Sequence, residues 1–183
     1  MINVTIHSAG YEQGKSTIND IQFHIQSKEI VGLIGGNGAG KSTTIQSILQ
    51  TIPFFEGEIN IPAYGYVPER PILYTYYTLR EHIHFLIELI GEDLWDNALS
   101  LCKLFRLDNH LDEYPTSFSK GMQQKVMLIL AFTPNYSLYI LDEPFMGLDP
   151  QAIRRLLLLI KERKEVGAAI LISTHALDTA ERL

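Results

Sequence analysis

The spacing of apolar residues changes several times along the chain, and each change predicts a new kind of element. Apolar residues occupy every second position over 2–6 and again over 21–25, with polar residues between them. This alternation is typical of half-buried strands. We expect these two strands to pair antiparallel through a turn at 10–15, and we expect shorter strands at 58–61 and 64–67.

Helical spacing replaces the alternation in the middle of the chain. A capping box stands at 78–81, and the apolar residues that follow it recur on one helical face up to Gly91. The same periodicity predicts helices over 94–105 and 121–132. We therefore expect a mostly helical lobe between about 70 and 131 of the sequence.

Strands and helices alternate again in the last third of the chain. The apolar run 138–141 predicts a short buried strand, and Pro150 opens a helix that ends near Val166. The run 168–173 predicts the last strand. This order is typical of an α/β fold.

A glycine-rich stretch within 29–50 carries the clearest chemistry. Gly35, Gly40, Lys41 and Ser42 fill the pattern G-x-x-x-x-G-K-[ST] between an apolar run and a helical pattern. Such a loop points its N–H groups at a polyphosphate, with the lysine reaching the β and γ phosphates and the hydroxyl binding Mg²⁺. The predicted fold class is therefore an α/β P-loop NTPase sheet with an N-terminal antiparallel β subdomain and an inserted helical lobe.

The letters GKST occur a second time, at 14–17, without the rest of the pattern. Ala9 stands where the first glycine of a P-loop is required, and the residues after the second GKST alternate like a strand. We interpret this second occurrence as a surface turn.

Composition narrows the class of protein. The 183 residues are 46% hydrophobic, which suits one domain over 1–183 with its own core. The net charge of −6 and the absence of a Lys/Arg cluster argue against nucleic acid as a partner. Cys102 is the only cysteine and lies among apolar residues, so we expect it in the core of a cytosolic protein. No apolar run approaches the length of a membrane span.

Two carboxylates end the apolar run 138–141. Asp142 fits a magnesium-binding aspartate and Glu143 a general base that polarises water, provided that their strand lies beside the P-loop strand. Without the P-loop, polar residues that end a strand before Pro144 would be an equally good interpretation.

The order of the motifs resembles the ATP-binding subunit of an ABC transporter across essentially the whole chain. GGNGAGKST is similar to Walker A, FSKGMQQK to the family signature, YILDEP to Walker B, MGLDP to the D-loop, and STH to the switch histidine. The resemblance implies that the domain hydrolyses ATP with Mg²⁺.

The resemblance also assigns residues to the nucleotide. Tyr11 would stack on adenine, and His175 would contact the γ-phosphate as a second catalytic residue beside Glu143. The implied phosphate-binding residues are Gly35, Asn37, Gly38, Ala39, Gly40, Lys41, Ser42 and Thr43.

The signature has both a local and an intermolecular interpretation. Ser119 is a good N-cap, and Gly121 would let a backbone N–H approach an anion closely, which alone indicates only a helix start. The resemblance implies that both residues close on the γ-phosphate held by another subunit. A chain with one P-loop and one signature then forms a homo- or heterodimer with two composite ATP sites.

Three residues depart from the usual family pattern. Glu69 replaces a glutamine near the metal, which adds a charged ligand to Ser42 and Asp142 and resembles some exporters. Lys120 and Met122 replace a glycine and a glutamine of the signature.

The implied partner is an integral membrane permease subunit, which would hold the domain peripherally at the inner, cytoplasmic face of the cell membrane. The tyrosine-rich stretch 71–77 would dock the permease or pack in the core. The alternatives are an ABC ATPase that acts on ribosomes or DNA and a non-hydrolysing regulatory cassette. A P-loop kinase or GTPase would leave the signature unexplained, and the chain has no N-K-x-D guanine-binding motif.

Overall fold

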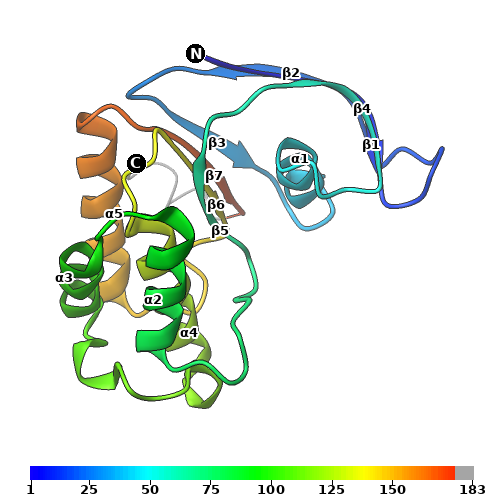
Figure 1. Cartoon of the computed structure of the whole chain (residues 1–183). Coiled ribbons are helices and arrows are strands. Elements are labelled where there is room, and N and C mark those ends of the chain that lie inside the picture. Colours follow the sequence, from blue (N-terminus) through cyan, green and yellow to red (C-terminus); the bar gives the residue numbers. More distant parts are fainter. Residues whose placement is uncertain (176–183) are drawn as a thin grey trace.

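The computed structural model describes residues 1–175, which form two sheets and a group of helices (Figure 1). The strands are β1 (Ile2–Gly10), β2 (Ile18–Ile25), β3 (Ile30–Ile34), β4 (Phe54–Ile59), β5 (Tyr64–Val67), β6 (Leu138–Asp142) and β7 (Ala169–Thr174). The helices are α1 (Lys41–Ile48), α2 (Leu79–Ile90), α3 (Trp95–Phe105), α4 (Lys120–Phe132) and α5 (Pro150–Glu165), with 3-10 turns at Asp108–His110 and Pro115–Ser117.

The N-terminal strands form an antiparallel sheet in the order β2-β1-β4. The predicted pairing of β1 with β2 is confirmed, with Ile2 opposite Ile25. The strand predicted at 58–61 instead spans Phe54–Ile59, because its limits are set by pairing with β1, where Phe54 lies opposite Gly10. An edge strand follows the strand beside it, so its own alternation is a weak guide to where it begins.

The other sheet is parallel, in the order β3-β7-β6-β5. Every residue of β6 and β7 is buried, which confirms the apolar runs as strands inside the sheet. Helices α2 to α5 gather on one side of this sheet, and α1 lies under the curved antiparallel sheet (Figure 1). One core fills the space between the sheet and the helices, and a second joins both sheets through Ile45 and Ile48 of α1.

Local signals explain where the helices begin and end. Thr78 and Glu81 form both arms of the predicted capping box, and Gly91 ends α2 with a φ of 77°. Helix α4 begins at Lys120, one residue before the expected start, with Ser119 as its N-cap. Among the described residues, no helix has the length and apolar character needed to cross a membrane.

Cys102 and the second GKST both lie where the sequence predicts. Cys102 is fully buried, and burial raises the pKa of its thiol to about 11. The second GKST is an exposed turn, closed by a bridge between Glu12 and Lys15 and by the positive φ of Gly14.

Candidate functional site

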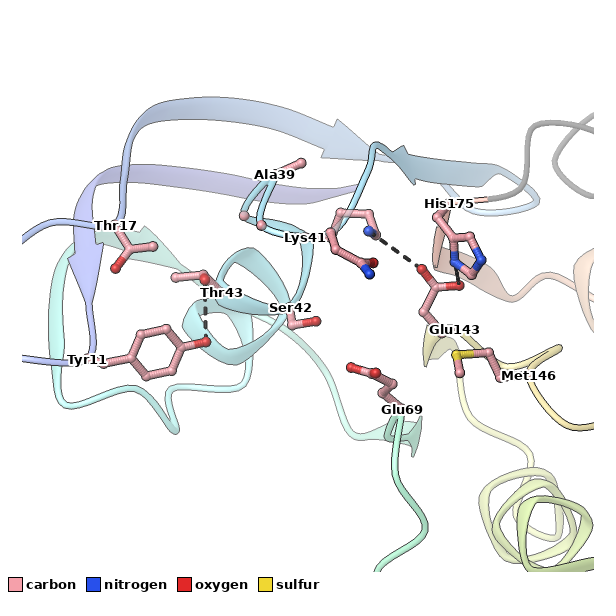
Figure 2. Close-up of a pocket in the computed structure, with 13 residues that line it drawn as sticks. Tyr11, Thr17, Ala39, Lys41, Ser42, Thr43, Glu69, Glu143, Met146 and His175 are labelled. Atoms are coloured by element: carbon pink, nitrogen blue, oxygen red, sulfur yellow. Dashed lines mark hydrogen bonds and ion pairs between the residues drawn. The ribbon is translucent and has the colours of Figure 1, made fainter. Parts of the chain in front are cut away.

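The carboxyl ends of the parallel strands meet at one cavity of about 560 Å³ (Figure 2). Strand β3 leads into the glycine loop, β7 into His175, β6 into Glu143, and β5 reaches Glu69 two residues beyond its end. The residues that line the cavity are Tyr11, Thr17, Asn37, Gly38, Ala39, Gly40, Lys41, Ser42, Thr43, Glu69, Glu143, Met146 and His175. Ligands of open α/β sheets bind at this edge.

The P-loop strand and the carboxylate strand are not neighbours, although the sequence argument required them to be. Strand β7 lies between β3 and β6. The two motifs still meet, because Lys41 Nζ reaches across β7 to within 3.5 Å of Glu143 Oε1. The strand between them also places His175 at the same edge of the sheet.

The glycine loop has the shape of a phosphate cradle. Gly40 has a φ of 89°, and a Cβ there would lie 2.6 Å from Ile18 Cγ2. At Gly35 a Cβ would lie 2.9 Å from the Ala39 side chain. Both positions therefore require glycine, and Gly40 also opens helix α1, whose first N–H groups are available to an anion.

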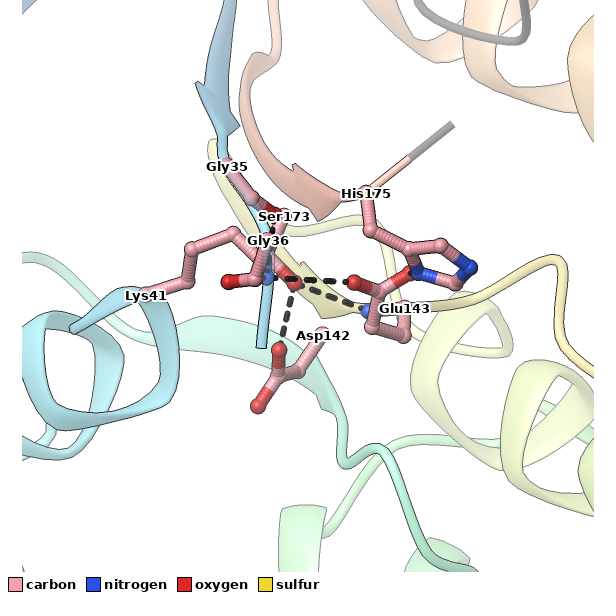
Figure 3. Close-up of polar contacts among 7 residues, drawn as sticks. All are labelled: Gly35, Gly36, Lys41, Asp142, Glu143, Ser173 and His175. Carbon is pink, nitrogen blue, oxygen red and sulfur yellow. Dashed lines mark hydrogen bonds and ion pairs between the residues drawn. The ribbon is translucent and has the colours of Figure 1, made fainter. Parts of the chain in front are cut away.

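Lys41 is held by oxygen atoms of its own chain. Its ammonium donates hydrogen bonds to the carbonyls of Gly35 at 2.8 Å and Gly36 at 3.3 Å, and it pairs with Glu143 (Figure 3). On the other side, His175 Nδ1 donates to Glu143 Oε2 at 2.9 Å. Glu143 is thus contacted from two sides by groups that carry or can carry positive charge.

Ser173 is a site residue that the sequence analysis missed. Its hydroxyl donates a hydrogen bond to Asp142 Oδ1 and accepts one from the backbone N–H of Glu143 at 2.9 Å. It is the first residue of the STH motif, but nothing in the sequence shows that it faces β6. The pairing of Asp142 with Ser173 in neighbouring strands brings them together.

The oxygen groups near the loop fit a magnesium ion. Ser42 and Glu69 line the cavity, and Asp142 lies beside Glu143 at the end of β6. The pKa of the neighbouring Tyr66 rises to about 12, first because of burial and second because of the Asp142 carboxylate. Among residues 1–175 no three His, Cys, Asp or Glu side chains converge as a metal cage. Mg²⁺ beside phosphates uses only one or two protein ligands, so a hydroxyl and a carboxylate suit it.

The far end of the cavity is formed by Tyr11, which is 51% exposed. Its hydroxyl lies 3.3 Å from Thr43 Oγ1, and Figure 2 shows it at the opposite end from Glu143 and His175. Thr17 and Met146 also line the cavity and were not expected there. Thr17 belongs to the GKST turn that the sequence suggested was unrelated to the site.

Ser119 and Gly121 are not among the residues that line the cavity. Ser119 is exposed and caps α4 by accepting a hydrogen bond from Met122 N–H at 3.3 Å. A Cβ at Gly121 would lie 2.4 Å from the carbonyl oxygen of Gly147, so close packing against the MGLDP segment also requires a glycine here.

Comparisons with known proteins agree on one family. A family model described as ABC transporter matches residues 18–146. Two Bacillus subtilis proteins are similar over the whole chain and 80% of their own lengths: the uncharacterized ABC transporter ATP-binding protein YthP, at 44% identity, and the ABC-type transporter ATP-binding protein EcsA, at 40%.

Solved structures agree as well. The structure of an ATP-binding subunit of an ABC transporter superposes with a TM-score of 0.92 and 41% identity, covering 100% of this chain and 82% of the other. The dimeric structure of the bacterial ABC transporter cassette MJ0796 has a TM-score of 0.85 at 22% identity, covering 100% of this chain and 91% of that one, and shows a shared fold.

Proposed function

The chain belongs to the ABC transporter family of ATP-binding proteins, and from this premise we propose that it binds MgATP and hydrolyses it to drive transport through a membrane partner. The observation that carries the proposal is the cavity where the P-loop, Glu143 and His175 converge. The end of the cavity formed by Tyr11 suits the adenine ring, and the end formed by the glycine loop suits the phosphates.

The contacts of Lys41 indicate which partners it exchanges when the phosphates bind. Its ammonium turns from the Gly35 and Gly36 carbonyls and from Glu143 to the β and γ phosphates, where the charges are larger. Glu143 is then free to accept the proton of a water molecule that attacks the γ-phosphate. His175 keeps the carboxylate oriented through its 2.9 Å contact. The Mg²⁺ held by Ser42 and Asp142, with Glu69 nearby, would neutralise phosphate charge.

We further propose that two copies, or this chain and a related one, share each ATP. Ser119 is exposed at the start of α4, outside the cavity that its own chain provides. A signature segment that contributes to a phosphate site must then do so in a second subunit. The MJ0796 cassette, which shares this fold, was solved as a dimer, and this supports the arrangement.

The membrane partner would dock on what we call the aromatic surface, the exposed residues Ile72, Tyr74, Tyr76, Tyr77 and Phe85. Tyr76 is 87% exposed and Ile72 is 75% exposed. Tyr74 and Phe85 rings pack edge to face at 5.5 Å, which makes a firm apolar platform. Exposed aromatic clusters of this kind favour protein interfaces over core packing. Such docking would hold the domain at the inner face of the membrane.

Glu143→Gln tests the hydrolysis proposal. The variant keeps the side-chain shape but cannot accept a proton, so we expect ATP binding to persist while turnover falls by about a hundredfold or more. Glu58→Gln, on the exposed part of β4, is the matched control and keeps wild-type turnover. Normal turnover by Glu143→Gln would overturn the assignment of the base. ATP binding without turnover by the wild-type chain would favour a regulatory cassette.

A further inference from the structure

Ser173 lies near the carboxyl end of β7, the strand that stands between β3 and β6 in the parallel sheet. It pairs with Leu33 of β3 on one side and with Asp142 of β6 on the other. Its side chain is fully buried in a strand that is otherwise mostly apolar. A hydroxyl in such a place needs hydrogen-bond partners.

Both partners of this hydroxyl belong to the carboxylate motif. Ser173 Oγ donates to Asp142 Oδ1 and accepts from the backbone N–H of Glu143 at 2.9 Å (Figure 3). One oxygen atom therefore fixes a side chain of one residue and the backbone of the next. Asp142 is only 4% exposed, so water has little access to replace this contact.

The backbone of Glu143 explains why it needs an anchor. Its φ is 47°, in the left-handed region that a residue with a long side chain rarely adopts. This conformation turns the chain sharply after β6, and the Glu143 side chain meets Lys41 and His175. Such strained positions persist where the surrounding structure holds them, and they cluster at functional sites.

We propose that Ser173 is a positioning residue that orients Asp142 toward the metal and holds Glu143 in its left-handed conformation. The inference rests on the proposed ATP hydrolysis. Ser173 is not among the residues that line the cavity, so it acts through these two residues. Groups that orient metal ligands in this way typically change metal affinity or activity by about 10–100-fold when removed.

The experiment compares Ser173→Ala with Thr133→Val. Thr133 is also fully buried and donates a hydrogen bond, to the Ile129 carbonyl at 2.7 Å, but it lies outside the cavity, so its variant controls for loss of a buried hydroxyl. We measure kcat, and separately the ATP dissociation constant with Mg²⁺ and with a chelator. The ratio of these two dissociation constants reports the contribution of Mg²⁺ to ATP affinity separately from kcat.

We expect Ser173→Ala to lower kcat about 10–100-fold and to reduce the Mg²⁺-dependent gain in ATP affinity about tenfold. Its ATP affinity in chelator stays within about twofold of wild type, because the glycine loop is unchanged. Thr133→Val leaves all three quantities near their wild-type values. Ser173→Cys, which keeps the shape with a weaker donor, gives intermediate values and serves if the alanine variant does not fold.

Wild-type kcat and a wild-type Mg²⁺ effect in folded Ser173→Ala or Ser173→Cys would overturn this inference but leave the proposed function standing. An equal loss in Thr133→Val would also overturn it, because the effect would then follow stability. Absence of ATP binding by the wild-type chain would overturn the proposed function together with this inference.

Discussion

Lys41 shows how one residue can serve both the glycine loop and the proposed phosphate site. Its ammonium is shared between two loop carbonyls and the Glu143 carboxylate, with only about a tenth of either charged side chain exposed. A buried carboxylate without such a partner would be costly, so the lysine also stabilises the burial of Glu143. In the proposed function, phosphate contacts of greater strength replace these contacts.

The two GKST stretches provide an internal comparison for this role. Lys41→Ala removes the charge that reaches the phosphates, and we expect the ATP dissociation constant to rise at least about tenfold, as for loss of a charge-assisted hydrogen bond. Lys15→Ala replaces the corresponding lysine of the second GKST, which lies in the exposed turn and pairs with Glu12. We expect this variant to leave the ATP dissociation constant unchanged. Isothermal titration measures both. If Lys41→Ala and wild type bound ATP with equal affinity, the P-loop would not be part of the ATP-binding site.

Residues that act within one contiguous motif could be located from the sequence. Lys41 and Ser42 follow from the spacing of the glycines, because the loop and helix are local structures. Thr17 and Ser173 could not be found in this way, since their contacts depend on how strands pair. A hydroxyl in an apolar strand has no sequence signal that names its partner.

Asp149, which precedes α5, contacts both α4 and α5. Lys125 Nζ donates to Asp149 Oδ2 at 2.8 Å, and Ala152 N–H donates to Asp149 Oδ1 at 2.8 Å as an N-cap bond. These contacts lower the pKa of Asp149 to about 2, with the Lys125 contact first and the N-cap bond second. The N-cap of α5 is therefore tied to α4 by one ion pair.

The low pKa of Asp149 gives a test of this link. The folded value of about 2 lies below the ordinary 3.8, so the carboxylate stabilises the fold above about pH 4 and loses that effect as pH falls toward 2. Asp149→Asn keeps a good N-cap without the charge. In urea unfolding at pH 7, we expect the free energy of unfolding of wild type to exceed that of Asp149→Asn by less than about 1 kcal/mol. The difference is small because the Asp149 side chain is half exposed.

The difference in free energy of unfolding between wild type and Asp149→Asn should shrink as the pH falls from 4 to the lowest pH at which both still fold. Lys125→Met should weaken the same pH dependence, since it removes the partner. A difference that stays constant with pH would show that the N-cap alone matters.

Elements with strong local signals could be predicted with nearly their true limits. The capping box and Gly91 define α2, and the apolar run fixes β6 to within one residue. Strand β4 could not be placed in this way, because its pairing with Gly10 of β1 decides where it begins. The order β3-β7-β6 could not be predicted either, because no local sequence pattern indicates which strand lies between the others.

The whole molecule presents the two parts of the proposed ATP site on different regions of its surface. The glycine loop follows β3 of the sheet, and the signature opens α4 among the helices (Figure 1). Both regions are accessible, as the exposure of Ala39 and Ser119 shows. We propose that each region completes an ATP site with its counterpart on another subunit.

Cross-linking between two cysteine variants tests whether the two regions meet across subunits. Ala39→Cys and Ser119→Cys are each made in the Glu143→Gln background, mixed, and treated with a short bis-maleimide. Cys102 does not compete, because it is fully buried and burial raises its pKa to about 11. We expect a covalent dimer only in the mixture and only with MgATP. A dimer that forms equally in either variant alone, or none while ATP is bound, would contradict a shared ATP site between two copies of this chain.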